Sequence, residues 1–302
     1  MSDRTTHSGL LVGVDGSTPS LSAVRWATYE AAMRNVPLTL VHAICETMLS
    51  SATSGWSADP GLWLDQENDA RNMIATAVKA VEDAVDGGKG PPVSTELLVS
   101  PPVPTLVELS QEAQMVVVGC RRRGALRRAL LGSVSAGVVH QAHCPVAVVH
   151  DEAPTSRQAN KLPVLVGVDG SRSSELTAAV AFDEASWRGV DLVALHARSD
   201  NNMFTIRRNK WLGWQPSAEE TVSECLAGLQ ERYPDVRVHR RMVEGRPARQ
   251  LLEESKTAQL VVVGGYGRGG FGRMSLESVS TEVVHAAHAP VIVVRPPLAE
   301  MQ

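Results

Sequence analysis

The stretch that decides the fold reads Val261-Val262-Val263-Gly264-Gly265-Tyr266-Gly267-Arg268-Gly269-Gly270-Phe271-Gly272, and the first half of the chain holds a related stretch, Val116-Val117-Val118-Gly119-Cys120-Arg121-Arg122-Arg123-Gly124. In both halves a serine, Ser133 or Ser278, stands fourteen residues after the glycine that closes the valine run. A β-branched run that ends on glycine is typical of a buried parallel strand entering a loop. Such a glycine lets the backbone approach a ligand closely, and free N–H groups at the start of a helix favour phosphate. The stretch therefore predicts a phosphate-binding loop, with Ser133 or Ser278 capping the helix that follows.

The repeat extends over the whole chain. The segment Val12-Gly13-Val14-Asp15-Gly16-Ser17 is matched by Val166-Gly167-Val168-Asp169-Gly170-Ser171, and residues 38–43 and 192–197 both end on His-Ala. A solenoid would repeat every ~20–50 residues, so this longer period indicates duplication of a whole domain. The repeat predicts domains at residues 1–150 and 151–302, with the polar residues 150–162 as their linker.

Each half alternates strand and helix patterns. In the first half the strands are expected at residues 9–14, 37–43, 94–99, 116–118 and 145–149, and the helices at residues 19–34, 66–85, 104–112 and 134–142, with a surface loop over residues 44–65. This alternation predicts an α/β fold: two tandem open parallel sheets, Rossmann-like and five-stranded, with helices on both faces. Ligands of such sheets bind beyond the carboxyl ends of the strands, where the strand order switches. Asp15 and Gly119, or Asp169 and Gly264, should converge there.

Composition sets the class of protein. Among the 302 residues, 43% are hydrophobic and 21% are charged, which is typical of a soluble globular protein. The formal net charge of −4 provides no general attraction to nucleic acid or to an anionic membrane. The four cysteines lack zinc-finger spacing and are interpreted as thiols in a reducing compartment. The N-terminus is polar, without a signal-peptide core, and no apolar run approaches the ~20 residues of a membrane span, so a cytoplasmic location is expected.

The first-strand segments and the later glycine loops together resemble the universal stress protein family, over nearly the whole chain and as two tandem domains. The nucleotide signature of that family is glycine, two residues, glycine, nine residues, glycine, then serine or threonine. The two copies depart from it at different places, because Arg122 replaces the second glycine in the first half and Glu277 replaces the third glycine in the second half.

The resemblance implies an ATP-binding protein that acts as a regulatory or signalling module in stress response. By the resemblance, Asp15 and Val41, or Asp169 and Leu195, face adenosine, while the glycine loops and serines hold the phosphates. A carboxylate near a triphosphate calls for a cation between them, so Mg²⁺ could accompany ATP. No catalytic or metal-binding residue is predicted. The predicted cofactor-binding residues are Gly13, Asp15, Val41, Gly119, Arg122, Arg123, Gly124, Gly132, Ser133 and Val134 in the first half, and Gly167, Asp169, Leu195, Gly264, Gly267, Arg268, Gly269, Gly270, Ser278, Val279 and Ser280 in the second.

The expected partners are ATP and an unidentified protein, with neither nucleic acid nor membrane. The last strands, at residues 145–149 and 290–294, are short and apolar, and an unpaired edge of this kind invites another strand. Single-domain members of the resembled family pair through this strand. The two domains are therefore expected to pair within one chain, and another surface could support a homodimer.

Other interpretations remain open at this point. The glycine loop of the second half also matches GxGxxG, but it follows the fourth strand, whereas the NAD fingerprint belongs after the first. A slow ATPase or adenylyl-transfer-type enzyme is the alternative function, although the SGGxDS, HIGH and KMSKS motifs are absent. A third possible function is that of a structural, partner-binding dimer that has lost the ability to bind nucleotide. The arginines Arg121, Arg122, Arg123, Arg127 and Arg128 form either a solvated face or a set of phosphate partners.

Histidines and tryptophans give weaker signals. His42 and His196 are interpreted as core or sheet-end residues rather than as catalytic bases. Two further pairs of histidines are three residues apart, a spacing that could suit a metal ion, but surface or interface positions are favoured for them. These are His140 with His143 and His285 with His288. The long loops are expected to carry tryptophans that cover the nucleotide or a partner, namely Trp56, Trp63, Trp211 and Trp214.

Overall fold

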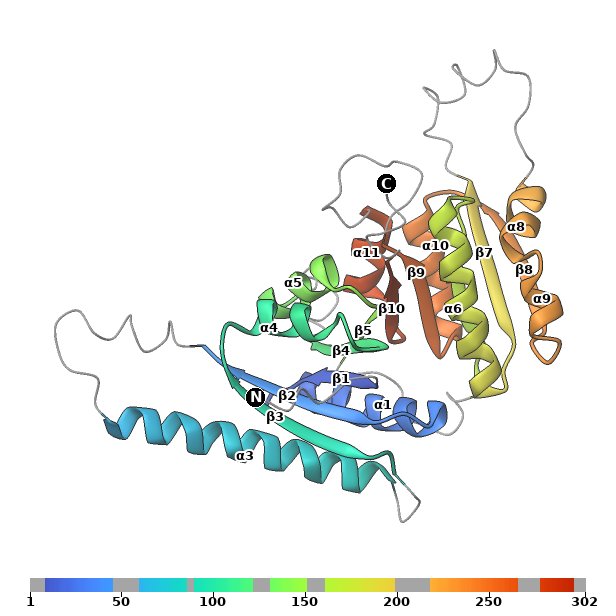
Figure 1. The fold of residues 1–302 in the computed structure, drawn as a ribbon. Helices are drawn as coiled ribbons and strands as arrows, with labels where there is room; N and C mark the ends of the chain where they lie inside the picture. Colours follow the sequence, from blue (N-terminus) through green and yellow to red (C-terminus); the bar gives the residue numbers. More distant parts are fainter. Residues whose placement is uncertain are drawn as a thin grey trace. The chain divides into compact units, whose positions relative to one another are not determined.

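The computed structural model in Figure 1 describes residues 9–45, 60–85, 90–121, 131–150, 161–198, 218–265 and 278–295. The chain forms two compact units, and the boundary between them along the chain falls after Asp151. Each unit is an α/β structure, as predicted. The elements of the first unit are β1 (Leu10–Gly13), α1 (Thr18–Arg34), β2 (Leu38–Ile44), α3 (Pro60–Val85), β3 (Val93–Val99), α4 (Pro102–Leu109), β4 (Met115–Cys120), α5 (Ser133–Gln141) and β5 (Val146–His150).

The second unit repeats this order. Its elements are β6 (Val164–Gly167), α6 (Arg172–Arg188), β7 (Leu192–Arg198), α8 (Ala218–Leu226), α9 (Leu229–Arg232), β8 (Val238–Glu244), α10 (Pro247–Glu254), the 3-10 turn η2 (Ser255–Thr257), β9 (Leu260–Gly264), α11 (Ser278–Ala286) and β10 (Val291–Val294). Within the units the strands run in the orders β3-β2-β1-β4-β5 and β10-β9-β6-β7-β8, and the pairings are parallel.

The core lies where the central strands meet the helices. In the first unit α1 and α3 contact each other on one face of the sheet, and α4 and α5 contact each other on the other (Figure 1). A strand covered on both faces must be apolar along its whole length. Accordingly, Val12 pairs with Val117 in the first sheet and Val166 with Val262 in the second, and all four side chains are buried.

Local signals in the sequence set the bounds of α1 and α6. Ser17 is the N-cap of α1 and accepts a hydrogen bond from the N–H of Ser20 at 3.4 Å. Both helices end on a residue with a left-handed backbone, Asn35 (φ 54°) or Gly189 (φ 62°), which stops the helix and turns the chain into the next strand.

Two predicted boundaries are wrong. Helix α3 begins at Pro60 rather than at residue 66, so Trp63 belongs to a helix and not to a loop. His150 ends strand β5 and is buried, so the linker does not begin there. Residues 151–160 and the other three loop tryptophans (Trp56, Trp211 and Trp214) lie outside the described residues.

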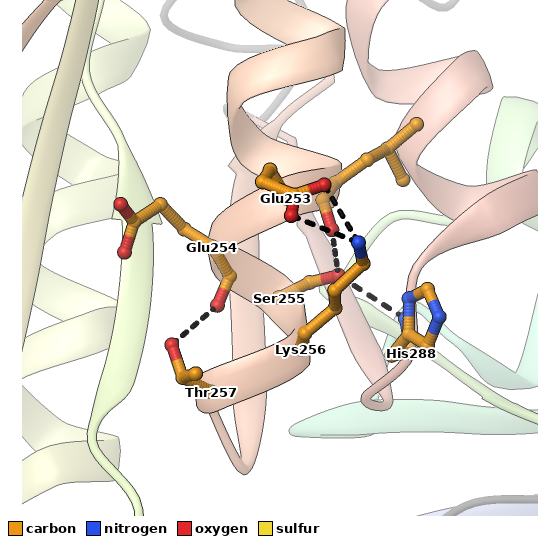
Figure 2. Close-up of polar contacts among 7 residues, drawn as sticks. Glu253, Glu254, Ser255, Lys256, Thr257 and His288 are labelled. Atoms are coloured by element: carbon orange, nitrogen blue, oxygen red, sulfur yellow. Dashed lines mark hydrogen bonds and ion pairs between the residues drawn. The ribbon is translucent and has the colours of Figure 1, made fainter.

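A buried serine ties the end of α10 to the turn that precedes β10. The Ser255 hydroxyl donates to the Leu252 carbonyl at 2.7 Å. It also accepts the His288 N–H at 3.2 Å (Figure 2). Ser110 makes the same two contacts in the first unit, with Val107 at 2.6 Å and His143 at 2.9 Å. Because both units contain this tie, it is part of the fold rather than of one unit's chemistry.

We expect Ser255→Ala to lower the free energy of unfolding by about 1–3 kcal/mol, because it removes a buried hydroxyl and leaves the half-buried His288 N–H without this acceptor. Thr257→Ala is the matched control. Thr257 also donates from its hydroxyl to a backbone carbonyl three residues earlier, at 3.1 Å, but it is exposed (Figure 2). Urea denaturation of both variants checks this; equal losses would show that burial of the serine does not matter.

Candidate functional site

The candidate site lies at the carboxyl edge of each sheet, where the strand order switches. Strand β1 lies between β2 and β4, and β6 lies between β7 and β9, so consecutive connections leave the sheet in opposite directions at this point. Ligands of open parallel sheets bind at such a switch. The predicted convergence is confirmed in the second unit, where Asp169 and Gly264 line one recess; in the first unit a Cβ on Gly119 would meet the backbone of Pro19 and Ser20 in the first turn of α1.

An aspartate turn follows the first strand of each unit. In the first unit Oδ1 of Asp15 accepts hydrogen bonds from the N–H of Ser17 at 3.0 Å and from its hydroxyl at 2.5 Å. In the second unit Oδ1 of Asp169 accepts from the N–H of Ser171 at 2.9 Å and from the hydroxyl of Ser174 at 2.5 Å. Each carboxylate is therefore held in one orientation by hydroxyl and backbone donors.

A histidine on the second strand holds the same turn from the other side. Nδ1 of His42 lies 2.7 Å from the Val14 carbonyl oxygen, and Nδ1 of His196 lies 2.8 Å from that of Val168. Because a carbonyl oxygen only accepts, Nδ1 carries the proton in both rings. This confirms the interpretation of His42 and His196 as sheet-end residues, and it fixes the residue just before each aspartate.

A serine hydroxyl closes the base of each glycine loop. Ser135 donates to the carbonyl of Gly119 at 2.8 Å, and Ser280 donates to that of Gly264 at 2.5 Å. Both serines are buried. Ser280 was among the predicted phosphate ligands, but its hydroxyl proton is engaged here, so a phosphate contact from it would use the backbone N–H. Ser135 was missed, although Val134-Ser135 matches Val279-Ser280 in the repeat.

The predicted caps of the loop helices are wrong in the first unit. Helix α5 begins at Ser133, so Gly132 occupies the N-cap position and makes no side-chain capping bond. The Ser133 side chain is exposed instead. Ser278 is likewise the first described residue of α11. The N-cap position of α5 is therefore a glycine, and the N-terminus of a helix is a place where anions are favoured.

The two strand-end glycines serve packing. A Cβ on Gly13 would lie 3.2 Å from Cδ1 of Leu106, and one on Gly167 would lie 3.2 Å from Cδ1 of Leu251. Val41 and Leu195 were predicted to face adenosine, and their carbonyls already have partners, because Val14 N–H donates to Val41 at 2.8 Å and Val168 N–H donates to Leu195 at 2.9 Å. A ligand could use only the second lone pair of either carbonyl.

The second unit has a recess of about 100 Å³ at this edge. Pockets that enclose a whole small ligand measure ~300–1,000 Å³, so the described walls accommodate one part of such a ligand. The walls combine apolar side chains with hydroxyls and one carboxylate, and they are formed by Gly167, Val168, Asp169, Ser173, Ser174, Leu195, Ala197, Pro247, Leu251, Val263, Gly264, Val279 and Ser280.

Several predicted ligands lie outside the described residues: Arg122, Arg123, Gly124, Gly267, Arg268, Gly269 and Gly270. Within the described part of the chain, no three His, Cys, Asp or Glu side chains gather as metal ligands would. No helix in that part has the length and apolar character of a membrane span.

Burial raises the pKa of the Cys144 thiol to about 12, so this cysteine stays protonated at neutral pH.

The electrostatics of the first site keep Asp15 ionised. Partial burial works to raise the pKa of its carboxyl, but the hydrogen bonds from Ser17 and Ser20 and the positive charge of Arg121 outweigh this, so the pKa lies below its usual range. The site therefore holds a carboxylate at neutral pH, able to accept hydrogen bonds and to attract a cation.

This lowered pKa predicts how stability depends on pH. A carboxyl with a lower pKa in the folded state contributes stability above its unfolded pKa, and this contribution is lost as the pH falls through the folded pKa. We expect the parent chain to be more stable than Asp15→Asn at pH 7, with the difference shrinking below about pH 4. Urea denaturation of both proteins across this range is the measurement. A difference that grows on acidification would contradict the prediction.

Comparisons with known proteins identify the family of the chain. The model of the universal stress protein family matches residues 9–150 and 162–295, one segment in each unit. A universal stress protein of Mycobacterium tuberculosis is 49% identical over 295 residues, which cover 98% of this chain and 99% of the relative. Another from Mycolicibacterium smegmatis is 47% identical over 299 residues, with 98% and 100% covered.

Solved structures show the same fold. A universal stress protein from Archaeoglobus fulgidus superposes with a TM-score of 0.70 at 20% identity, over 96% of this chain and 99% of that one. The family match over both units and the identity to full-length relatives lead to one conclusion. The chain belongs to the universal stress protein family, as a member with two tandem domains.

Proposed function

We propose that this protein is a cytoplasmic regulatory module that binds ATP at the carboxyl edge of its sheets. The observation that carries the proposal is a pair of features found in both units, at the edge of the sheet where the strand order switches. In each unit a fixed carboxylate, Asp15 or Asp169, stands beside a loop closed by a serine bond, from Ser135 or Ser280. Both features lie where a ligand of an open parallel sheet would bind.

The residues present fit an adenine nucleotide. Leu195, Leu251 and Val263 supply an apolar wall in the second unit, against which a base can pack. The carboxylate accepts hydrogen bonds from ribose hydroxyls, and the helix that follows the glycine loop directs its first N–H groups toward the phosphates. Mg²⁺, when bound, would neutralise phosphate charge facing the carboxylate.

The first test is stabilisation by ligand. If ATP binds only the folded state, ATP with Mg²⁺ at 100 times its dissociation constant should raise the free energy of unfolding by about 2.7 kcal/mol. Asp15→Ala combined with Asp169→Ala should abolish this stabilisation by ATP. Glu67→Ala, which removes one partner of the surface ion pair with Arg71, should leave it intact. Chemical denaturation with and without ligand measures this, and no stabilisation of the parent chain would contradict ATP binding.

The second test separates a binding module from an enzyme. A regulatory module should retain bound ATP unchanged, whereas a slow ATPase or adenylyl-transfer-type enzyme should convert it. We expect the nucleotide recovered after prolonged incubation to be ATP, as measured by chromatography of the released ligand. Accumulation of ADP or AMP in proportion to protein concentration would favour the enzyme.

A further inference from the structure

The second unit has a larger recess at the opposite edge of its sheet. This recess has a volume of about 510 Å³ and lies where β6, β7 and β8 begin and α6 ends. The recess described above lies where β6 and β7 end, so the two are separate. Because pockets for small molecules measure ~300–1,000 Å³, the larger recess can hold a whole small ligand.

A carboxylate and an imidazole form a pair in the wall of this recess. Oδ2 of Asp191, just before β7, lies 2.6 Å from Nε2 of His239 on β8. An ionised carboxylate only accepts hydrogen bonds, so Nε2 carries the proton and Nδ1 of the neutral ring is an acceptor. Within the described part of the chain, Oδ1 of Asp191 and Nδ1 of His239 have no partner, and the two side chains are 48% and 49% exposed. The pair thus offers two acceptors to the hydroxyls of a ligand.

Two cations also line the recess, and their charges are balanced differently. Arg188 lies 2.6 Å from the buried carboxylate of Glu184. Lys161 is exposed, and among the residues that the structure describes no carboxylate pairs with it. Its ammonium group can therefore donate to an anionic ligand without giving up such a pair. Pro163 and Val190 add apolar surface between the polar groups.

The first unit builds the same corner of its sheet without the charged pair. In the matching register of the first sheet, Pro37 takes the place of Asp191 and Ser94 takes that of His239. Neither carries a charge, and the Ser94 hydroxyl lies 2.9 Å from that of Thr39. Exposed ion pairs contribute little to stability. The fold therefore does not require Asp191 and His239, and the pair is available for binding.

We propose that this recess binds a sugar phosphate, with the phosphate on Lys161 and the sugar hydroxyls on Asp191 and His239. An ammonium group donates charge-assisted hydrogen bonds to phosphate oxygens. Sugar hydroxyls donate to the carboxylate oxygen and to the ring nitrogen, and the carbon skeleton packs against Pro163 and Val190. Since the cation and the acceptors recognise different parts of the ligand, neither inorganic phosphate nor a neutral sugar should bind as tightly as the sugar phosphate.

The test is an NMR titration of the isotope-labelled full chain with glucose 6-phosphate, following the amide signals of Gly189 and Val190 in the wall of the recess. These signals should shift, and glucose and inorganic phosphate should each bind about tenfold more weakly, the size of one hydrogen bond to a charged group. Lys161→Gln should lose about tenfold in affinity for glucose 6-phosphate. His239→Phe should weaken the binding of glucose 6-phosphate but not that of inorganic phosphate. Lys79→Gln, which removes an exposed lysine from α3 of the first unit, is the control and should bind as the parent chain does.

The location and the selectivity of binding decide the outcome. Unshifted Gly189 and Val190 signals, or shifts confined to Gly264 and Ser280 at the carboxyl edge, would overturn the proposed site. Equal affinity for inorganic phosphate and glucose 6-phosphate would show that the hydroxyls make no contribution and would overturn the assignment to a sugar phosphate. None of these results bears on ATP binding at the other edge, which is tested separately by stabilisation with ATP.

Discussion

Gly119→Ala is expected to lower the free energy of unfolding of the first unit by about 3 kcal/mol, the upper end for an overpacked core position. A Cβ at this position would lie 2.4 Å from the carbonyl carbon of Pro19 and 2.6 Å from the nitrogen of Ser20. These are backbone atoms in the first turn of α1, so no side-chain rotation can relieve the clash. Either α1 or β4 must shift, and both belong to the core of the unit.

Gly132→Ala is the matched control, because among the described residues a Cβ there would meet Oγ of Ser135 alone, at 3.8 Å. We expect its stability to stay within about 0.5 kcal/mol of the parent. Urea denaturation measures both variants. If Gly119→Ala kept the parent's stability and lost only ATP affinity, the glycine would serve the phosphates, as the sequence alone suggested, and not the packing of α1.

Arg188→Ala is expected to destabilise the second unit by about 3–5 kcal/mol, the range for breaking a buried ion pair. The guanidinium of Arg188 lies 2.6 Å from the carboxylate of Glu184, one helical turn away, and the side chains are 9% and 0% exposed. Removing the arginine takes this ion-pair partner from a carboxylate that has no access to solvent. The first unit repeats the arrangement with Glu30 and Arg34 at 2.8 Å.

The control has the same geometry without the burial. Arg71 lies 2.6 Å from Glu67 at the same helical spacing, but these side chains are 69% and 33% exposed. We expect Arg71→Ala to cost about 0.5 kcal/mol. Thermal and urea unfolding of the two variants measure the contrast, and similar losses would show that burial does not set the energy of these pairs.

Much of the fold could be predicted because its signals are local. The valine runs and the Asp-Gly-Ser turns each occupy a few consecutive residues, and their recurrence in both halves identified the strands and the edge at which Asp15 and Asp169 lie. Parallel strands bring their carboxyl ends to one edge, so the convergence followed from topology. The start of helix α3 was predicted at residue 66 rather than at Pro60, because Gly61 and Trp63 continue the Ser-, Gly- and Trp-rich composition of the preceding residues into its first turn.

The site details could not be predicted, because they depend on contacts between distant segments. Nothing near Gly119 in the sequence shows that the first turn of α1, some hundred residues earlier, passes against it. The hydroxyl of Ser135 reaches back sixteen residues to a carbonyl, and a serine inside a helix pattern gives no sign of that. Side-chain partners of this kind emerge only when the chain is folded.

The serine bond at the base of each glycine loop has a consequence for how such loops change. The bonded residues, Gly119 with Ser135 and Gly264 with Ser280, are the same sixteen positions apart in both units. A segment whose two ends are fastened to the scaffold can accumulate substitutions between them without disturbing the strand or the helix outside. After duplication the two loops could therefore diverge, one toward arginine and the other toward glycine. Replacing residues 265–279 with the sequence of residues 120–134 should leave the second unit folded.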